Sequence, residues 1–402
     1  MDRKINILAL SFLFPNRVHQ NHGIFVLNRL AALSKYVNVK VINPIPWSPF
    51  HKYIDRFKEY ESIPEKDIVD GLEVYYPRYF SIPRYMKFIE TQSYYHSVKS
   101  VVNNLSSSFD FDIVDMHWTF PDLSAGIKIS NESNKPSIVT LRGMEALHLG
   151  ENNHKENEVR KGLKSVNHIV ALSDELRQQG SRLSEDPGKG VVIINGVDTD
   201  NFQYLCKAHS RNELGIDEDE KIILAVGSLI KRKGFDYIIK ALSVLRETQD
   251  LHNLKLYIVG SQGPEGDYRN HLFDLVEQNK LKESVHFVGQ VQNSKLKLWY
   301  NAADVFCLSS HGEGSPNVLS EALACGCPVV TTDVGSARDI TQLVSGSGIC
   351  MKVLSIDNLV NSIATTLNSN IDRESLSKDY SKYDWDWCAQ KVLEIYKQCI
   401  EK

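Results

Sequence analysis

Short runs of β-branched and other apolar residues recur along the chain, and stretches of helix length separate them. These runs are residues 5–13, 37–42, 113–116, 137–141, 168–172 and 191–194 in the first half, and 221–226, 254–259, 285–287, 305–308 and 328–332 in the second. Continuous apolar strands that alternate with helices are typical of parallel sheets buried on both faces. The pattern predicts an α/β protein with two doubly wound, Rossmann-like domains.

The boundary between the domains is expected at Asn195-Gly196, where a strand ends in a turn-forming pair and polar sequence follows. We therefore expect an N-terminal domain of residues 1–195 and a second domain of residues 196–382. Residues 383–402 have apolar side chains at near-helical spacing, which predicts an amphipathic C-terminal helix.

Composition and charge narrow the classes of function. Of the 402 residues, 42% are hydrophobic, which suffices for two packed cores. Lys and Arg number 46 against 50 Asp and Glu, and the resulting net charge of −4 disfavours a general polyanion binder. We expect no nucleic-acid partner.

The cysteines and the N-terminal residues indicate the compartment. The seven cysteines are an odd number and lie in apolar runs, as in proteins of reducing compartments. Residues 5–14 follow Arg3 and Lys4 but lack a small-residue cleavage pattern, so a buried strand is favoured over a signal peptide. No other apolar run approaches 18 residues. The sequence predicts a cytoplasmic protein.

Residues 75–95 combine aromatic rings with basic side chains, and two interpretations stay open. The rings are Tyr75, Tyr76, Tyr79, Phe80, Tyr85, Phe88, Tyr94 and Tyr95, accompanied by Arg78, Arg84 and Lys87 against the single acid Glu90. This composition suits peripheral contact with the inner face of a membrane. Alternatively, a helix packs its aromatic face on the first domain.

The segment 311–330 contains two acids in a glycine-rich turn and the helix after it. Glu313 lies in the turn, Pro316 suits the first helical turn, and Glu321 lies in the helix. Because this helix follows the strand at 305–308, its first amides should point at an anion beyond the carboxyl end of the sheet. These amides belong to Asn317, Val318 and Leu319.

A second strand, turn and helix start lies at 225–235, with Arg232 and Lys233 in its turn. Cations at a helix N-terminus are unfavourable unless an anion binds there, so the segment indicates a phosphate-bearing ligand. It matches neither the Walker loop nor the dinucleotide fingerprint, and a solvated basic loop is the alternative.

His117 and Arg142 follow two first-domain strands, where each either meets a ligand or has a structural role.

These motifs, taken in chain order, resemble retaining GT-B glycosyltransferases of the fourth sequence family, whose E-x7-E motif matches Glu313 and Glu321. The resemblance covers nearly the whole chain, including residues 112–117, 140–143 and 195–202. It implies two Rossmann-like domains facing a cleft, an acceptor-side first domain, and a second domain that binds a nucleotide sugar, with UDP as the expected nucleotide. It also implies that the C-terminal helix returns to the first domain and that no metal or other cofactor is required.

The resemblance further implies roles for individual residues. Lys233 would neutralise the diphosphate, Glu313 would meet hydroxyls of the donor sugar, and Glu321 would bind the ribose. Gly23 would let backbone approach the donor, and His117 would line the acceptor side near the transferred sugar, with Arg142 facing the same cleft. The catalytic residues would thus be His117, Glu313 and Lys233. The remaining donor contacts would be Ser228, Val291, Ser315, Pro316 and the amides of 317–319. Where the family commonly has Arg the chain has Ser228, and Arg232 is expected to replace that cation.

The leading function is therefore transfer of a sugar to a growing glycan, for which a lipid-linked polysaccharide precursor suits the aromatic segment. A nucleotide-sugar epimerase of similar fold and a non-catalytic sugar-binding protein are the alternatives.

Four Asp-x-Asp pairs occur, but none ends a clear central strand, so we expect no metal site.

Overall fold

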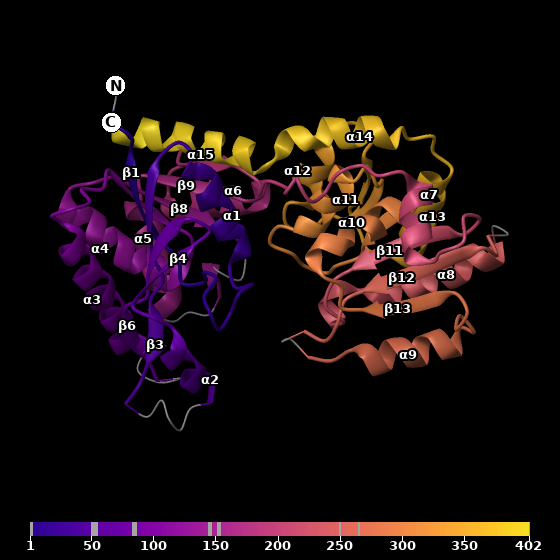
Figure 1. Cartoon of the computed structure of the whole chain (residues 1–402), viewed down its shortest axis with the longest axis horizontal. Helices are drawn as coiled ribbons and strands as arrows, with labels where there is room; N and C mark the ends of the chain where they lie inside the picture. Colours follow the sequence, from indigo (N-terminus) through magenta and orange to yellow (C-terminus); the bar gives the residue numbers. More distant parts are fainter. Residues whose placement is uncertain are drawn as a thin grey trace. The chain divides into compact units, whose positions relative to one another are not determined.

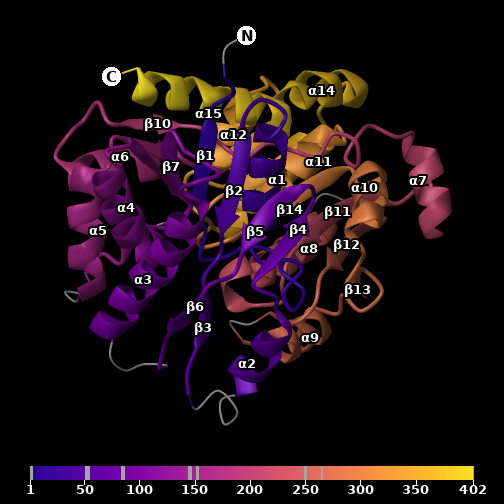
Figure 2. The same ribbon diagram turned by 60° about the vertical axis from the view of Figure 1, so that its left-hand side comes forward.

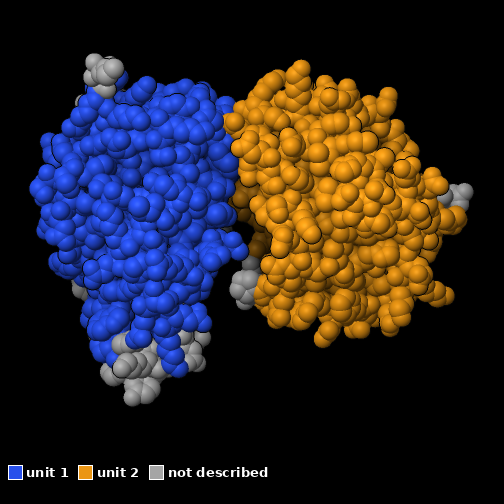
Figure 3. Space-filling model, viewed as in Figure 1, with its two compact units in different colours: residues 1–195, 385–402 blue, residues 196–384 orange. Residues whose placement is uncertain are grey.

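The computed structural model describes residues 3–49, 55–82, 87–143, 147–150, 154–248, 251–263 and 266–401. The chain forms two compact units: unit 1 comprises residues 1–195 and 385–402, and unit 2 comprises residues 196–384 (Figure 3). Each unit contains a mainly parallel sheet with helices packed on it (Figures 1 and 2). The predicted α/β class with two Rossmann-like units is confirmed.

Unit 1 is built on an eight-stranded sheet in the order β10-β9-β8-β7-β1-β2-β5-β4. All neighbouring strands are parallel except β4 and β5, which form an antiparallel hairpin. A separate parallel pair joins β3 and β6. The strands are β1 (Asn6–Leu10), β2 (Asn38–Ile42), β3 (Ile45–Trp47), β4 (Lys66–Val69), β5 (Leu72–Tyr75), β6 (Arg78–Phe80), β7 (Ile113–Met116), β8 (Ser137–Leu141), β9 (His168–Ala171) and β10 (Gly190–Val192).

The large sheet of unit 1 is buried on both faces because side chains alternate along each strand. Leu8 and Leu10 of β1 join one core, to which α3 (Lys87–Leu105), α4 (Ser124–Ser133), α5 (His154–Ser165) and α6 (Asp174–Ser184) contribute. Ile7 and Ala9 join the opposite core, which includes residues of α1 (Ile24–Leu33) and the C-terminal helix α15 (Trp385–Ile400). The C-terminal helix therefore packs within unit 1, against α1. Unit 1 also contains α2 (Asp55–Lys58) and the short helices Glu59–Ser62 and Thr119–Leu123.

Unit 2 contains a fully parallel six-stranded sheet in the order β13-β12-β11-β14-β15-β16. Its strands are β11 (Lys221–Val226), β12 (Leu254–Val259), β13 (Val285–Gly289), β14 (Val305–Leu308), β15 (Val329–Thr332) and β16 (Gly348–Met351). Its helices are α7 (Lys207–Leu214), α8 (Phe235–Thr248), α9 (Arg269–Gln278), α10 (Asn293–Ala302), α11 (Asn317–Ala324), α12 (Ala337–Gln342), α13 (Ile356–Leu367) and α14 (Arg373–Tyr380), with short 3₁₀ helices at Lys231–Lys233 and Ser381–Tyr383.

Strand order reverses once in each sheet, between β1 and β7 in unit 1 and between β11 and β14 in unit 2. The loops after two such strands lead to opposite sides of the sheet, which opens a crevice at their carboxyl ends. Open α/β sheets bind ligands there. These two switch points are where functional side chains are to be sought.

Several predicted boundaries are corrected by the structure. The first strand ends at Leu10 and not at residue 13, because the chain leaves the sheet after the Ser11 amide bonds the Ile42 carbonyl. The strand predicted at 191–194 is Gly190–Val192. The sequence prediction missed β3, β4, β5, β6 and β16. The last helix begins at Trp385, after a 3₁₀ turn over 381–383.

The aromatic segment at 75–95 is mostly internal. Tyr76, Tyr79, Tyr94 and Tyr95 are buried in unit 1, and the rings of Tyr79 and Tyr94 meet edge to face with centroids 5.0 Å apart. Tyr94 and Tyr95 pack from a helix, α3, as the second interpretation proposed, whereas Tyr79 lies on β6 and Tyr76 lies between β5 and β6. Residues 84 and 85 and the side chains of residues 87 and 88 lie outside what the structure describes. No helix in the described ranges is both long and apolar enough to cross a membrane.

Candidate functional site

The switch point of unit 2 brings the two main sequence motifs together. Loops after the neighbouring strands β11 and β14 place Lys233 beside Glu313. The Lys233 Nζ donates to Glu313 Oε1 over 2.6 Å, and the Ser310 hydroxyl donates to the same oxygen over 2.6 Å. Arg232 Nη1 donates to Glu313 Oε2 over 3.2 Å. Three donors from two loops thus hold one carboxylate, and we call Arg232, Lys233, Ser310 and Glu313 the cation cluster.

Glycine at position 234 allows this close approach of the two loops. Gly234 has φ of 64°, and a Cβ there would lie 2.1 Å from the Ser309 carbonyl oxygen. The Ser309 hydroxyl donates to the Gly234 carbonyl over 2.8 Å and joins the loops directly. The cations form a 3₁₀ turn at 231–233, and α8 begins only at Phe235, so they precede the helix and do not lie in its first turn.

The cation cluster carries more positive than negative charge. Its two cations share a single acid, whose side chain is only 10% exposed, while that of Lys233 is 15% exposed. Partial burial lowers the effective dielectric, so an additional anion would gain more here than at an open surface. Arg232 lies in the same cluster as Lys233, and its replacement of the family arginine missing at Ser228 stays a prediction.

The start of α11 offers fewer free amides than the sequence predicted. Pro316 directly precedes the helix, and its carbonyl accepts a hydrogen bond from the Leu319 amide over 2.9 Å. The prediction that Leu319 presents a free amide is therefore wrong, because the first turn of the helix uses this donor. Ser315 accepts a hydrogen bond from the Ser336 hydroxyl over 2.9 Å. Val291 lies half-buried in the loop after β13.

Glu321 lies apart from the cations, in the body of α11. Its Oε2 accepts a hydrogen bond from the Tyr300 hydroxyl over 2.9 Å. Burial raises the pKa of Glu321 to about 7. The two acids of the motif thus have different surroundings: Glu313 is held by cations and Glu321 by a phenol.

The switch point of unit 1 holds His117, which directly follows β7, and Arg142, which directly follows β8. His117 is fully buried, and its Nε2 lies 3.3 Å from Asp115 Oδ2. Its Nδ1 lies 2.8 Å from Arg142 Nη2, and Arg142 Nε donates to the His117 carbonyl over 3.2 Å. Asp115 and Arg142 thus flank the two ring nitrogens, and the place of His117 on the acceptor side stays a prediction.

Gly23 opens α1 as the sequence predicted. Its φ is 63°, and a Cβ would lie 2.2 Å from the Leu13 carbonyl oxygen. Any side chain at this position would push the start of α1 away from the loop after β1. The Arg142 guanidinium carbon lies 4.9 Å from the centroid of the neighbouring Phe25 ring, which connects this helix start to the His117 environment.

Sequence reasoning missed Asp115, Ser310 and Tyr396. Asp115 precedes His117 by two positions along an extended segment, so their side chains lie on the same face. The two-residue spacing of side chains along a strand could therefore have identified Asp115 from the sequence. Ser310 follows a buried strand at the switch point. Like Glu313, it could have been identified because ligands bind at the carboxyl ends of parallel strands. Tyr396, which donates to Asp115, lies on the C-terminal helix, and no local pattern connects it to β7.

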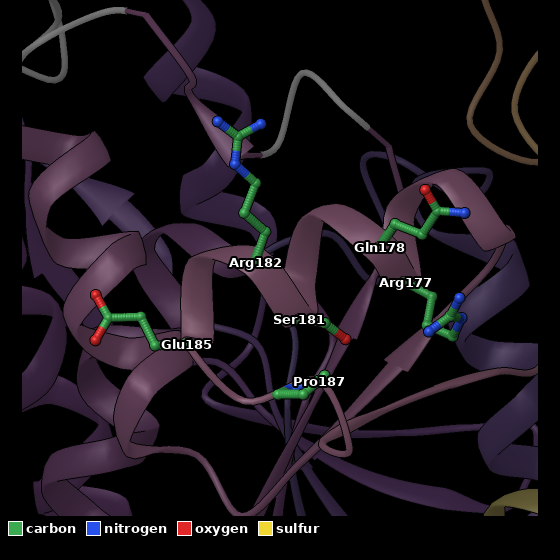
Figure 4. A pocket seen from close by; sticks show the side chains of 6 residues that line it. All are labelled: Arg177, Gln178, Ser181, Arg182, Glu185 and Pro187. Atoms are coloured by element: carbon green, nitrogen blue, oxygen red, sulfur yellow. The ribbon is translucent and has the colours of Figure 1, made fainter.

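Other features of the described residues are less informative. In the described part of the chain, no three His, Cys, Asp or Glu side chains gather where they could hold a metal ion, and metal independence stays a prediction. A cavity of about 420 Å³ lies along α6 of unit 1 (Figure 4). It is lined by Arg177, Gln178, Ser181, Arg182, Glu185 and Pro187, none of which is a predicted site residue.

Comparison with known proteins supports the fold and decides the enzyme class. Sucrose-phosphate synthase from Thermosynechococcus elongatus superposes with a TM-score of 0.75 at 19% identity, covering 98% of this chain and 99% of that one. Anabaena HepE in complex with UDP gives a TM-score of 0.73 at 16% identity, covering 98% and 100%. A sequence model of group 1 glycosyl transferases matches residues 207–383, and one of family 4 glycosyltransferases matches residues 55–201. The chain is a GT-B glycosyltransferase.

Curated relatives of this glycosyltransferase carry the same class of name. It is 27% identical over 355 residues to an uncharacterized glycosyltransferase from Methanocaldococcus jannaschii, which covers 84% of this chain and 88% of the relative. It is 26% identical over 347 residues to the putative teichuronic acid biosynthesis glycosyltransferase TuaC from Bacillus subtilis, which covers 84% and 83%. The family models and these relatives do not support the epimerase or the non-catalytic alternative.

Proposed function

We propose that this glycosyltransferase moves a sugar from a UDP-linked donor to a growing glycan, with retention of anomeric configuration and without a metal ion. The cation cluster at the switch point of unit 2 carries the proposal, since two fixed cations in a partly buried setting suit a diphosphate. UDP as the nucleotide is supported by the UDP and UDP-glucose complexes of HepE. A growing polysaccharide as acceptor is supported by the name of the Bacillus relative, which refers to teichuronic acid biosynthesis, and a lipid-linked precursor is the form that we propose.

The chemistry needs negative charge to be stabilised as the donor breaks. The bond between the anomeric carbon and the diphosphate breaks, a bond to the acceptor oxygen forms, and the acceptor proton passes to a diphosphate oxygen. Lys233 and Arg232 would compensate the charge on the departing diphosphate. Because Glu313 already holds both cations, little reorganisation is needed when that charge develops. Cations of the chain would thus do what a metal ion does elsewhere.

Binding roles follow for the two acids. The lone pairs that Glu313 does not share with Lys233, Arg232 and Ser310 would accept hydroxyls of the donor sugar. Glu321 would accept the ribose hydroxyls through the oxygen that Tyr300 does not use. Unit 1 would supply the acceptor side with His117 and Arg142, and its Gly23 would let backbone approach the donor. Because Arg142 bonds the His117 ring, a direct contact between Nδ1 and a sugar requires Arg142 to move.

We extend the proposal to peripheral contact with the inner face of the membrane, where a lipid-linked acceptor would be met. The buried tyrosines give no support, but Trp47 of β3 and Ile89 of α3 are 41% and 42% exposed. Co-sedimentation with anionic vesicles tests this point. Equal recovery of Trp47→Ser and wild-type protein with the vesicles would contradict it.

Product analysis tests the function directly. The enzyme is incubated with UDP-sugars and lipid-linked glycan acceptors, with magnesium or with a chelator, and the anomeric configuration of the product is read from its proton coupling constants. We expect an α-linked product from an α-linked donor at equal rates with and without magnesium. A β-linked product would refute retention, loss of activity with the chelator would refute metal independence, and absence of product with every UDP-sugar would refute the donor class.

A further inference from the structure

A buried line of polar side chains connects the C-terminal helix of unit 1 to His117. The Tyr396 hydroxyl on α15 donates to Asp115 Oδ2 over 2.6 Å, and the same oxygen lies 3.3 Å from His117 Nε2. On the other side of the ring, Arg142 Nη2 lies 2.8 Å from Nδ1. Tyr396, Asp115 and His117 are fully buried, and Arg142 is 5% exposed. Protein neighbours alone surround each group, and His117 Nε2 lies close to Asp115 without meeting the geometry of a hydrogen bond.

The hydrogen bonds define the tautomer of His117. An arginine side chain only donates, so Nδ1 must accept from Arg142 and carries no proton. Burial lowers the pKa of His117, against the influence of Asp115, so the ring is neutral. Its single proton then lies on Nε2, facing Asp115. Burial alone would raise the pKa of Asp115, but His117 and the Tyr396 hydroxyl hold it below its usual value.

The Tyr396 hydroxyl is not required simply to attach α15. The helix buries Cys388 and Val392 in the core that it shares with α1 (Figure 2). At its half-buried beginning, Asp386 accepts a hydrogen bond from the Tyr36 hydroxyl over 2.8 Å. These contacts hold the helix without touching Asp115. The Tyr396 hydroxyl has instead a specific acceptor that faces the histidine.

We propose that Tyr396 is a positioning residue for His117: its hydroxyl fixes the Asp115 carboxylate, which in turn fixes the orientation of the imidazole ring. A carboxylate with one donor removed would turn toward other partners, and the ring would lose the fixed negative charge that lies 3.3 Å from its Nε2. The effect on sugar transfer rests on the proposed function, in which His117 lies near the transferred sugar. The effect on the ring itself does not.

The test compares Tyr396→Phe with Tyr36→Phe, which removes the other tyrosine hydroxyl that holds α15. Protein with isotope-labelled histidines is studied by NMR, and His117→Gln identifies the His117 signals by their loss. Because Arg142 remains in every variant, we expect the Nε2-protonated tautomer throughout, whereas the His117 ring signals should shift in Tyr396→Phe and match the wild type in Tyr36→Phe. For release of UDP from a UDP-sugar, kcat should fall about tenfold in Tyr396→Phe while the donor KM stays within twofold, and Tyr36→Phe should match the wild type.

The outcomes distinguish three cases: Tyr396 positions His117, Tyr396 only attaches α15, or the proposed function is wrong. His117 signals that match the wild type in Tyr396→Phe, or equal losses of kcat in the two tyrosine variants, would overturn the proposal. Altered His117 signals in an enzyme that transfers no sugar would leave positioning intact and refute the proposed function. If Tyr396→Phe does not fold, Asp115→Asn is the second variant: a shift of the His117 ring signals is again expected, and unchanged signals would overturn the proposal.

Discussion

Replacing Lys233 by alanine removes a largely buried cation that bonds Glu313 over 2.6 Å. A unit charge about 4 Å from a diphosphate oxygen contributes roughly 4 kcal/mol at an effective dielectric constant of about 20. Glu313 compensates part of this charge and Arg232 remains in the variant, so we expect a loss of about 2.7 kcal/mol of transition-state stabilisation. That loss corresponds to about a 100-fold lower kcat/KM. Glu313→Gln should have a similar effect, because it releases both cations from their fixed positions.

The assay follows release of UDP from a UDP-sugar, with water as the acceptor where no glycan acceptor is available. Lys207→Ala is the matched control: it breaks an ion pair with Asp304, whose side chain is also 10% exposed, in the same unit. Asp304 directly precedes β14, at the end of the sheet opposite the cation cluster. The control should lose stability but keep kcat/KM within about twofold. A folded Lys233→Ala enzyme with kcat/KM within threefold of wild type would refute the reasoning.

Three further predictions concern the site and its scaffold. Burial raises the pKa of Glu321 to about 7, so the carboxylate that would accept the ribose hydroxyls forms between pH 6 and pH 8. Calorimetric titrations should therefore show that a UDP-sugar binds more tightly at pH 8 than at pH 6. An equal increase in affinity in Glu321→Gln would contradict the ribose role. Gly234→Ala should lower both the melting temperature and kcat/KM, because its Cβ would lie 2.1 Å from a backbone oxygen. Gly215→Ala is the control: this glycine also has a positive φ, of 66°, but its Cβ would have no atom within 4 Å. The control should lose only about 1 kcal/mol of stability and no activity. Burial raises the pKa of Asp122 to about 7, so between pH 4 and pH 7 the folded state keeps a proton that the unfolded chain releases. The contribution of Asp122 to the free energy of unfolding therefore falls as pH rises from about 4 to 7, by at most about 4 kcal/mol. Denaturation at pH 5 and pH 8 should show a smaller fall in Asp122→Asn, and identical pH dependence in both proteins would contradict the assignment.

The central strands were predictable because burial on both faces demands an uninterrupted apolar run. The runs at 113–116, 137–141, 221–226, 254–259 and 305–308 match strands residue for residue. The short strands β3 and β6 have three residues each and leave no such run. The β4–β5 hairpin did leave a signal that was overlooked: Asp70-Gly71 lies between short alternating segments, and both residues adopt positive φ.

The site was predictable to the extent that chain topology determines it. Lys233 and Glu313 are 80 positions apart, yet each follows a strand at the switch point, so strand order alone brings them together. The contact between Tyr396 and Asp115 spans 281 positions and depends on how α15 packs, which no sequence spacing encodes. Enclosure of His117 by Arg142 is likewise a product of tertiary packing.

Calorimetric titration of the wild-type enzyme and Lys233→Ala with UDP, GDP, ADP and the matching sugar conjugates tests the central claim most directly. The account predicts that UDP and a UDP-sugar bind the wild type, with or without magnesium, and that Lys233→Ala weakens this binding at least tenfold while Lys207→Ala does not. Absence of binding by any nucleotide at millimolar concentration, or equal affinities in wild type and Lys233→Ala, would contradict the assignment of the donor diphosphate to the cation cluster.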